Sequence, residues 1–239
     1  MTCAALISQS NYIPWRGYFD LIASADIFII LDDVQYTRRD WRNRNRIKTP
    51  TGSQWISIPI ISKGKYLQRI NETMVAGPGW SMEHWKTLEH NYRKAPFFDE
   101  ISAWLMPLYR QAAELTLLSE INRNFLEAVC RYLDISTRFH WSTDFFSIET
   151  LDGFDKNQRI LELCNKVGAN RYISGPLALE YMDKKAFEAA GIDVDFADYG
   201  HYPPYPQMHG AFDPYISIID TLFNTGKKTR DYTVGYAIR

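Results

Sequence analysis

The chain has 239 residues, of which 46% are hydrophobic, and its 27 Lys and Arg residues nearly balance 28 Asp and Glu residues. A chain of this length can bury a large core, and its overall charge gives no reason for a general attraction to nucleic acid or to an anionic membrane. Three distant cysteines without paired Cys or His spacing, and no apolar run near the ~20 residues of a membrane span, lead us to expect a soluble cytoplasmic protein with neither disulfides nor a bound metal.

The first 60 residues predict the beginning of a parallel sheet. An apolar run at 4–8 indicates a strand, and a polar loop and a short helix over 17–25 follow it. The continuous apolar run at 27–31 is typical of a strand that is covered on both faces. A third strand is predicted at 55–60, where Pro59 ends it. This order of elements favours an α/β fold.

Residues 80–133 have a different period. Apolar residues recur there at three- and four-residue steps, which predicts three helices. Pro96 separates the first helix from the second, and Ser119 is a plausible cap for the third. We interpret 79–134 as a helical insertion within a single α/β domain that covers residues 1–239.

The α/β alternation returns after this helical block. Strands are predicted at 137–141, 171–174 and 194–197, and helices over 155–167 and 183–190, which Asp155 and Asp183 cap. A last helix is predicted to open at Asp213 and Pro214 and to close near 224–226. Together with the first strands, this pattern predicts a Rossmann-like parallel sheet.

The loop after the first strand is the first candidate site. Ligands of open α/β sheets bind at the carboxyl ends of the strands, so Gln9, Tyr12 and Trp15 are candidates for binding a substrate. The alternative is a turn that uses Pro14 and Gly17 for its geometry and buries its aromatic rings. The loop carries no glycine-rich phosphate-binding motif.

The second candidate site follows the second predicted strand. Asp32 and Asp33 offer two carboxylates for general base chemistry or for holding an amine. Residues 36–48 then carry six basic residues and one acidic residue, interleaved with aromatic rings. Their candidate substrate-binding and oxyanion-binding members are Arg42, Asn43, Arg44, Asn45 and Arg46. The alternatives are a solvated loop whose charges pair with one another and a binding segment for single-stranded RNA, for which the segment is short.

Two later segments complete the candidate residues. Ser174 and Gly175 directly follow a predicted strand and are candidate binding residues. His201 follows the last strand and is a candidate general base, although a lone histidine is often structural. Tyr205 belongs to an aromatic and proline-rich rim around it. A metal site at His201 and His209 has no third ligand in sequence.

The chain closely resembles the WbqC-like protein family over nearly its full length. The resemblance rests on three motifs and a later Tyr-Ile-Ser-Gly at 172–175: Ser8-Gln9-x-x-Tyr12-Ile13-Pro14-Trp15-x-Gly17, Leu31-Asp32-Asp33-Val34-Gln35-Tyr36 and Trp41-x-Asn43-Arg44-Asn45-Arg46-Ile47. It implies a role in O-antigen or related polysaccharide biosynthesis, with a suggested activity as a glycine transferase that forms an N-glycyl amide on an amino sugar.

The first strand, loop and helix are also similar in layout to the nucleotidylyltransferase superfamily. That superfamily has a His-x-Gly-His signature at this place, of which only Gly17 is present. The similarity therefore implies a Rossmann-like nucleotide-binding scaffold whose chemistry differs from the superfamily's usual adenylyl or cytidylyl transfer.

Our leading hypothesis is an N-acyltransferase, of glycyl or aminoacyl type, that acts on a nucleotide-linked amino sugar. Asp33, with Asp32 as the alternate, orients or deprotonates the amine, and His201 is a second candidate base. The arginines bind diphosphate, Asn43 or Asn45 donates to the oxyanion, and Tyr12 and Trp15 pack on the sugar or base.

The donor and the competing functions stay open. The acyl donor is an activated glycyl or acyl group, small or carrier-bound, and aminoacyl-tRNA is the one nucleic acid that fits this role. One alternative is a nucleotidylyltransferase-like enzyme that activates a carboxylic acid with ATP. The other is a non-catalytic module that binds a nucleotide sugar or RNA.

Overall fold

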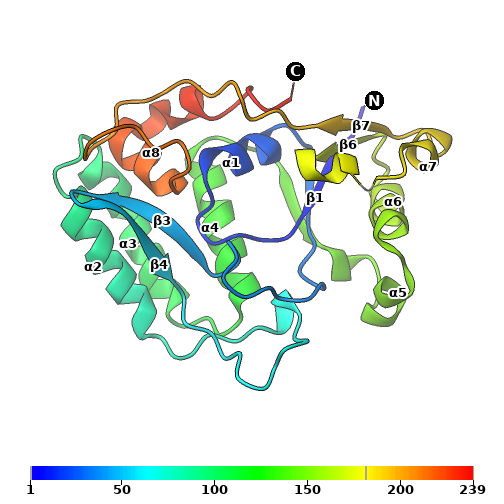
Figure 1. The fold of residues 1–239 in the computed structure, drawn as a ribbon, viewed down its shortest axis with the longest axis horizontal. Coiled ribbons are helices and arrows are strands. Elements are labelled where there is room, and N and C mark those ends of the chain that lie inside the picture. The colour runs from blue at the N-terminus through cyan, green and yellow to red at the C-terminus, as the bar shows by residue number, and fades with distance from the viewer. Residues whose placement is uncertain (1, 181, 239) are drawn as a thin grey trace.

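The computed structural model describes residues 2–180 and 182–238 (Figure 1). Its centre is a five-stranded sheet in the order β5-β2-β1-β6-β7, and every neighbouring pair is parallel. The strands are β1 (Ala4–Ser8), β2 (Ile27–Ile30), β5 (Arg138–Trp141), β6 (Arg171–Ser174) and β7 (Asp193–Phe196). The sheet confirms the predicted Rossmann-like α/β class.

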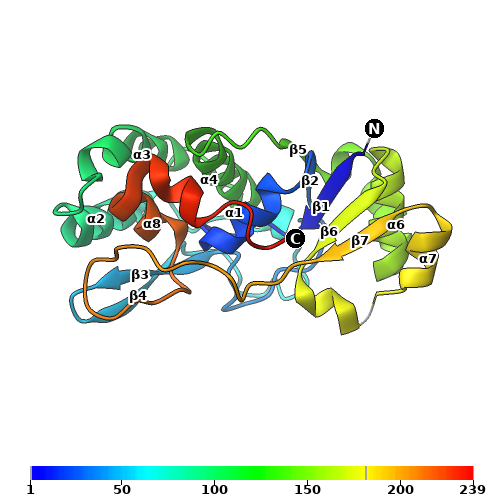
Figure 2. The ribbon, with the colours of Figure 1, turned by 90° about the horizontal axis from the view of Figure 1, so that it is seen from above.

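Helices cover both faces of this sheet. Side chains alternate along each strand, so Leu6 and Phe28 belong to one core cluster while Ile7 and Ile29 belong to another. The larger cluster also contains side chains of α1 (Arg16–Ala23), α2 (Gly79–Tyr92), α3 (Phe98–Ala112), α4 (Leu118–Tyr132) and α8 (Ile218–Thr225). Figure 2 shows α2, α3 and α4 together on one side of the molecule.

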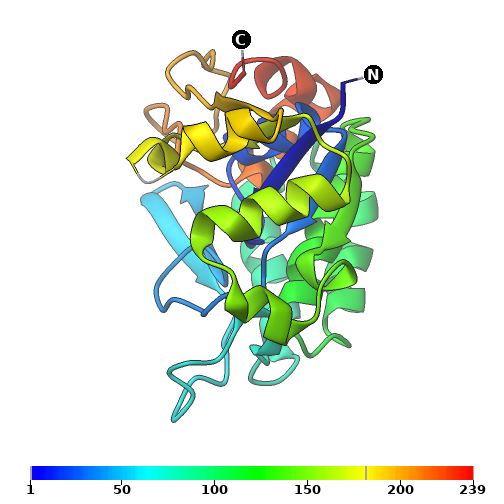
Figure 3. The ribbon, with the colours of Figure 1, turned by 90° about the vertical axis from the view of Figure 1, so that its right-hand side faces the viewer.

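The second face packs against the helices that follow β5. These are α5 (Ile148–Gly153), α6 (Lys156–Lys166) and α7 (Lys184–Ala189), and Figure 3 shows α6 lying across the sheet. Asp155 and Asp183 cap α6 and α7 as predicted, because their carboxylates accept from the amides of Gln158 and Ala186. Across the described ranges, no helix is both long enough and apolar enough to cross a membrane.

A hairpin outside the central sheet was not predicted. It joins β3 (Arg44–Thr49) and β4 (Gly52–Ser57) in antiparallel register through a two-residue turn. The strand expected at 55–60 therefore starts earlier and pairs with β3 instead of extending the parallel sheet. One face of the hairpin, including Ile47 and Ile56, is buried in the larger core cluster.

Two helix starts differ from the predictions. α8 begins at Ile218, where the Ser217 hydroxyl accepts from the Ile219 amide, whereas Asp213 accepts from the Tyr215 amide in a turn before the helix. Ser119 does not cap α4, because the helix already begins at Leu118, one residue before Ser119. Its hydroxyl donates to the buried carboxylate of Asp32 instead.

The strand order gives the sheet one switch point. From β1 the chain adds β2 and β5 on one side and later adds β6 and β7 on the other, so the order reverses between β1 and β6. Ligands of open α/β sheets bind at such a switch point, outside the carboxyl ends of the strands. The ends that meet here are followed by Gln9 and Gly175.

Candidate functional site

The loop between β1 and α1 contains a strained residue. Ile13 has a φ of 36°, a left-handed conformation that is unfavourable for a β-branched side chain, and it is fully buried. Its carbonyl accepts from Asn45 Nδ2 at 2.9 Å and from Ser217 Oγ at 2.7 Å. Strain of this kind persists only where surrounding structure imposes it, and it gathers at functional sites.

A pocket of about 160 Å³ opens beside this loop. Its lining comes from three separate segments and consists of Asn11, Pro14, Trp15, Trp41, Asn45 and Tyr215. Sites that enclose a drug-sized ligand have volumes of roughly 300–1,000 Å³. The pocket therefore suits one part of a larger ligand, with the remainder lying on the neighbouring surface.

Trp15 connects the pocket to the segment that follows β7. Its ring makes edge contacts with Tyr199 and Tyr202, at centroid distances of 5.0 and 5.5 Å, and lies 6.3 Å from Tyr215. A side chain at position 17 would collide with the same ring, so the glycine there permits the close approach. The predicted packing surface of Trp15 thus lies in the pocket wall.

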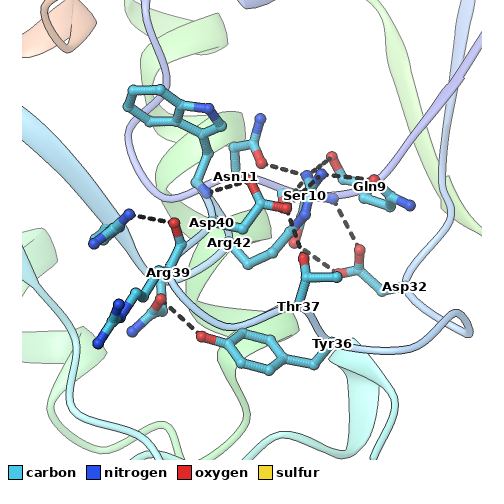
Figure 4. Close-up of polar contacts among 12 residues, drawn as sticks. Gln9, Ser10, Asn11, Asp32, Tyr36, Thr37, Arg39, Asp40 and Arg42 are labelled. Carbon is cyan, nitrogen blue, oxygen red and sulfur yellow. Dashed lines mark hydrogen bonds and ion pairs between the residues drawn. The ribbon is translucent and has the colours of Figure 1, made fainter.

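Arg42 holds the β1–α1 loop in place, as Figure 4 shows. Its guanidinium donates to Gln9 Oε1 at 2.6 Å, to the Ser10 carbonyl at 3.2 Å and to Asn11 Oδ1, and it lies 3.6 Å from Asp40. These bonds occupy the donors that were expected to bind diphosphate. Arg42 and Gln9 therefore fix the loop that carries Asn11 into the pocket.

The two adjacent carboxylates are buried beneath the site. Asp32 is 1% exposed and accepts from the Ser10 amide at 2.8 Å, from Ser10 Oγ at 2.7 Å and from Ser119 Oγ. Burial raises the pKa of Asp32, and these hydrogen bonds oppose that rise. The carboxylate thereby joins the end of β2 to the β1–α1 loop and to α4.

Asp33 is equally buried and forms an internal ion pair. Its carboxylate accepts from Arg159 Nη1 at 3.0 Å and from Ser142 Oγ. Since neither carboxylate has surface available to an amine, the expectation that Asp33 or Asp32 contacts the substrate is corrected. Both carboxylates hold together the segments at the carboxyl ends of the strands, next to the pocket.

Three further predicted residues have internal roles. Tyr12 is fully buried, its ring packs in the core, and its hydroxyl bonds His84 Nδ1 at 2.9 Å, so the expectation that it packs on a ligand is corrected. Asn43 donates to the Ile58 carbonyl and accepts from a tyrosine hydroxyl. Asn45 lines the pocket, but its amide donates to the carbonyls of Tyr12 and Ile13.

Arg44 and Arg46 lie on the outer face of the hairpin. The guanidinium of Arg44 is 4.2 Å from the ring centroid of Trp55. Arg46 donates to the Tyr215 carbonyl at 3.2 Å and lies 4.0 Å from Asp213. Arg46 thereby contacts Tyr215, which lines the pocket.

Ser174 and Gly175 lie at the end of β6, whereas Tyr205 lies in the segment after β7. Ser174 is buried at the end of β6, and the Tyr199 hydroxyl lies 3.9 Å from where a Cβ on Gly175 would stand. Tyr205 is also buried, and its hydroxyl donates to Asp220 at 2.8 Å. The expectation that Tyr205 belongs to a rim around the site is corrected, because its side chain is buried and bonds to the buried Asp220.

His201 is accessible and is held by a carboxylate. Its side chain is 39% exposed, and Nε2 lies 2.7 Å from Asp198 Oδ2. The residue stands between Tyr199 and Tyr202, whose rings contact Trp15. Among the predicted bases, His201 is thus the accessible one, and it lies on the segment whose tyrosines contact the pocket residue Trp15.

Sequence reasoning did not single out Asn11, Trp41, Trp55 or Tyr215 as site residues. Trp41 stands among the arginines, and this alternation was the signal for it; Trp55 and Tyr215 join the site only through tertiary structure. Within residues 2–180 and 182–238, the structure contains no group of three or more His, Cys, Asp or Glu side chains arranged to hold a metal ion.

Comparison with known proteins agrees with the motifs. The chain is 50% identical over 226 residues to the uncharacterized protein Rv1507c of Mycobacterium tuberculosis (strain ATCC 25618 / H37Rv), and the match covers 95% of each chain. No solved structure matches the sequence. The model of the WbqC-like protein family matches residues 9–232, which include both sides of the pocket. The chain therefore belongs to the WbqC-like protein family.

Proposed function

We propose that the protein is an N-acyltransferase, of glycyl or aminoacyl type, that acts on the amine of a nucleotide-linked amino sugar. The observation that carries this proposal is the pairing of an accessible histidine, His201, with Asp198 on the segment whose Tyr199 and Tyr202 contact the pocket residue Trp15. Amide formation needs a base for the amine proton, and a carboxylate that orients an imidazole prepares it for that role. The family resemblance to polysaccharide-cluster proteins supports the same substrate class.

The roles of the other residues follow from their contacts. The sugar occupies the pocket between Trp15 and Tyr215, and its amine attacks the acyl carbonyl of the donor. The new N–C bond forms as the donor's leaving group departs, and the amine proton passes to His201. Because Arg42 only donates, Asn11 turns its oxygen toward it, and the amide nitrogen of Asn11 donates to the oxyanion.

The test is amide formation by the purified chain, measured by mass spectrometry with panels of nucleotide-linked amino sugars and glycyl or acyl donors. We expect His201→Ala to lower the rate about 10²- to 10⁴-fold, the usual contribution of a positioned base. His140→Ala is the matched control, since His140 is 37% exposed and lies 3.7 Å from Asp144. Equal rates for both variants and the native chain would exclude His201 as the base.

A second candidate function is ATP-dependent activation of a carboxylic acid. The reversal of strand order between β1 and β6 favours it, because nucleotides bind at such points in doubly wound sheets. Pyrophosphate release that requires glycine would support this reaction over transfer from a preformed thioester or aminoacyl-tRNA. Tight binding of a nucleotide sugar without turnover would instead indicate a non-catalytic binding module.

A further inference from the structure

Two exposed tryptophans lie together beside the pocket. Trp41 is 41% exposed and Trp55 is 43% exposed, and their ring centroids are 5.3 Å apart with an interplanar angle of 38°. Trp41 also lines the pocket, so the two rings continue the pocket wall onto the hairpin surface. A contiguous exposed aromatic surface of this kind marks an interaction site more often than a single exposed ring does.

The register of the hairpin adds cations to this surface. Side chains alternate along β3, so Asn45 and Ile47 are buried while Arg44 and Arg46 lie on the outer face, where Arg46 is opposite Trp55. The guanidinium carbons of the two arginines are 4.2 and 5.9 Å from the Trp55 ring centroid. The geometry thus presents aromatic rings and planar donors on one face.

The charge of this surface is positive. In the described ranges, Arg44 forms no salt bridge; its Nη2 donates to the Arg39 carbonyl, and its Nε has no hydrogen-bond partner. Arg46 lies 4.0 Å from the carboxylate of Asp213, which is the outer limit for an ion pair. The other nearby carboxylate, that of Asp40, lies 3.6 Å from Arg42. An anionic ligand that arrives here therefore meets guanidinium groups whose charge is incompletely compensated.

We propose that Trp41, Trp55, Arg44 and Arg46 form a platform for the nucleoside diphosphate of the substrate. The base stacks on the tryptophan pair, the diphosphate contacts the two arginines, and the attached sugar enters the pocket past Trp41 and Tyr215. Two neighbouring rings give room for about one base, which favours a nucleotide over an extended RNA strand. This inference rests on the proposed function for the identity of the sugar-bearing ligand.

The platform is tested by calorimetric titration of the full chain with nucleoside diphosphates, namely UDP, CDP, GDP and ADP. We expect Trp55→Ala to weaken binding about 5- to 100-fold, as loss of stacking on one aromatic ring does, and Trp55→Phe to retain most of the affinity. Arg44→Ala is expected to weaken binding and to reduce its salt dependence. Tyr66→Ala, which removes a 74% exposed ring elsewhere, is the control and keeps native affinity.

Circular dichroism and a denaturant curve show that each variant is folded before its affinity is compared. Native affinity in folded Trp55→Ala and Arg44→Ala overturns the platform, as does binding of single-stranded RNA by a chain that binds none of the four nucleotides. Amide formation with an unchanged KM in Trp55→Ala overturns the platform and leaves the proposed function standing. Nucleotide binding that depends on Trp55, without any amide product, supports the platform and overturns the proposed function.

Discussion

His84 lies between the β1–α1 loop and the β3–β4 hairpin, and both of its ring nitrogens are used. Nε2 is 3.2 Å from the Ser57 carbonyl and Nδ1 is 2.9 Å from the Tyr12 hydroxyl. Because a carbonyl oxygen only accepts, Nε2 carries a proton, and in the neutral imidazole Nδ1 accepts from Tyr12. The imidazole thus links two segments that carry pocket residues.

The protonation of His84 makes stability depend on pH. Burial lowers its pKa from about 6.5 to about 4, so the unfolded chain takes up this proton more readily than the folded chain. The stabilisation is complete above pH 6.5 and is lost as the pH falls from 6.5 to 4, by about 3 kcal/mol for a difference of this size. Denaturant unfolding at pH 7.0 and pH 4.5 measures the loss.

Other groups titrate in the same range, so the control is His84→Gln, whose amide has no charge to gain. We expect the native chain to lose more stability than this variant between the two pH values. Parallel losses would show that His84 is not the group responsible.

At the level of elements, the ion pair of Asp33 and Arg159 joins the end of β2 to α6. The carboxylate is fully buried, and the arginine side chain is 15% exposed. We expect Asp33→Asn to reduce the free energy of unfolding by about 3–5 kcal/mol, because it leaves a buried guanidinium without its counterion. Chemical denaturation measures this change.

The matching variant Arg159→Met separates loss of the pair from loss of either residue. We expect the loss of stability in the double variant to be smaller than the sum of the two single losses. Asp33→Asn leaves the guanidinium unpaired and Arg159→Met leaves the carboxylate unpaired, whereas the double variant leaves neither. Additive effects would mean that the two groups do not stabilise each other.

β1 and β2 could be predicted because each is a short apolar run between polar segments. β3 could not, because Arg44 and Arg46 alternate with Asn45, and a charged strand without a visible partner looks like a loop. The candidate loops were therefore found, but the burial of their carboxylates was not. The partners of Asp32 and Asp33 include side chains 87 and 126 residues away, which no local pattern reveals.

On the scale of the whole molecule, the carboxyl-terminal segment is fastened to α1 beside the site. Asp20 is fully buried and accepts from the amides of Gly235, Tyr236 and Ala237 at 2.7, 2.9 and 2.6 Å. It also accepts from the Tyr202 hydroxyl at 2.8 Å. One carboxylate therefore holds both the chain end and the segment that carries the candidate base.

This arrangement predicts that Asp20→Ala loosens the chain end and the site together. Removal of the carboxylate leaves four donors without their acceptor, and we expect a loss of at least about 3 kcal/mol in unfolding free energy. Hydrogen exchange at residues 235–237 should accelerate, and so should exchange at 199–202, because Tyr202 loses its anchor. Asp231→Ala is the control, since Asp231 is exposed in the same terminal segment. If exchange accelerates at 235–237 but stays unchanged at 199–202, the two segments are held independently, and Asp20 does not couple the carboxyl terminus to the pocket.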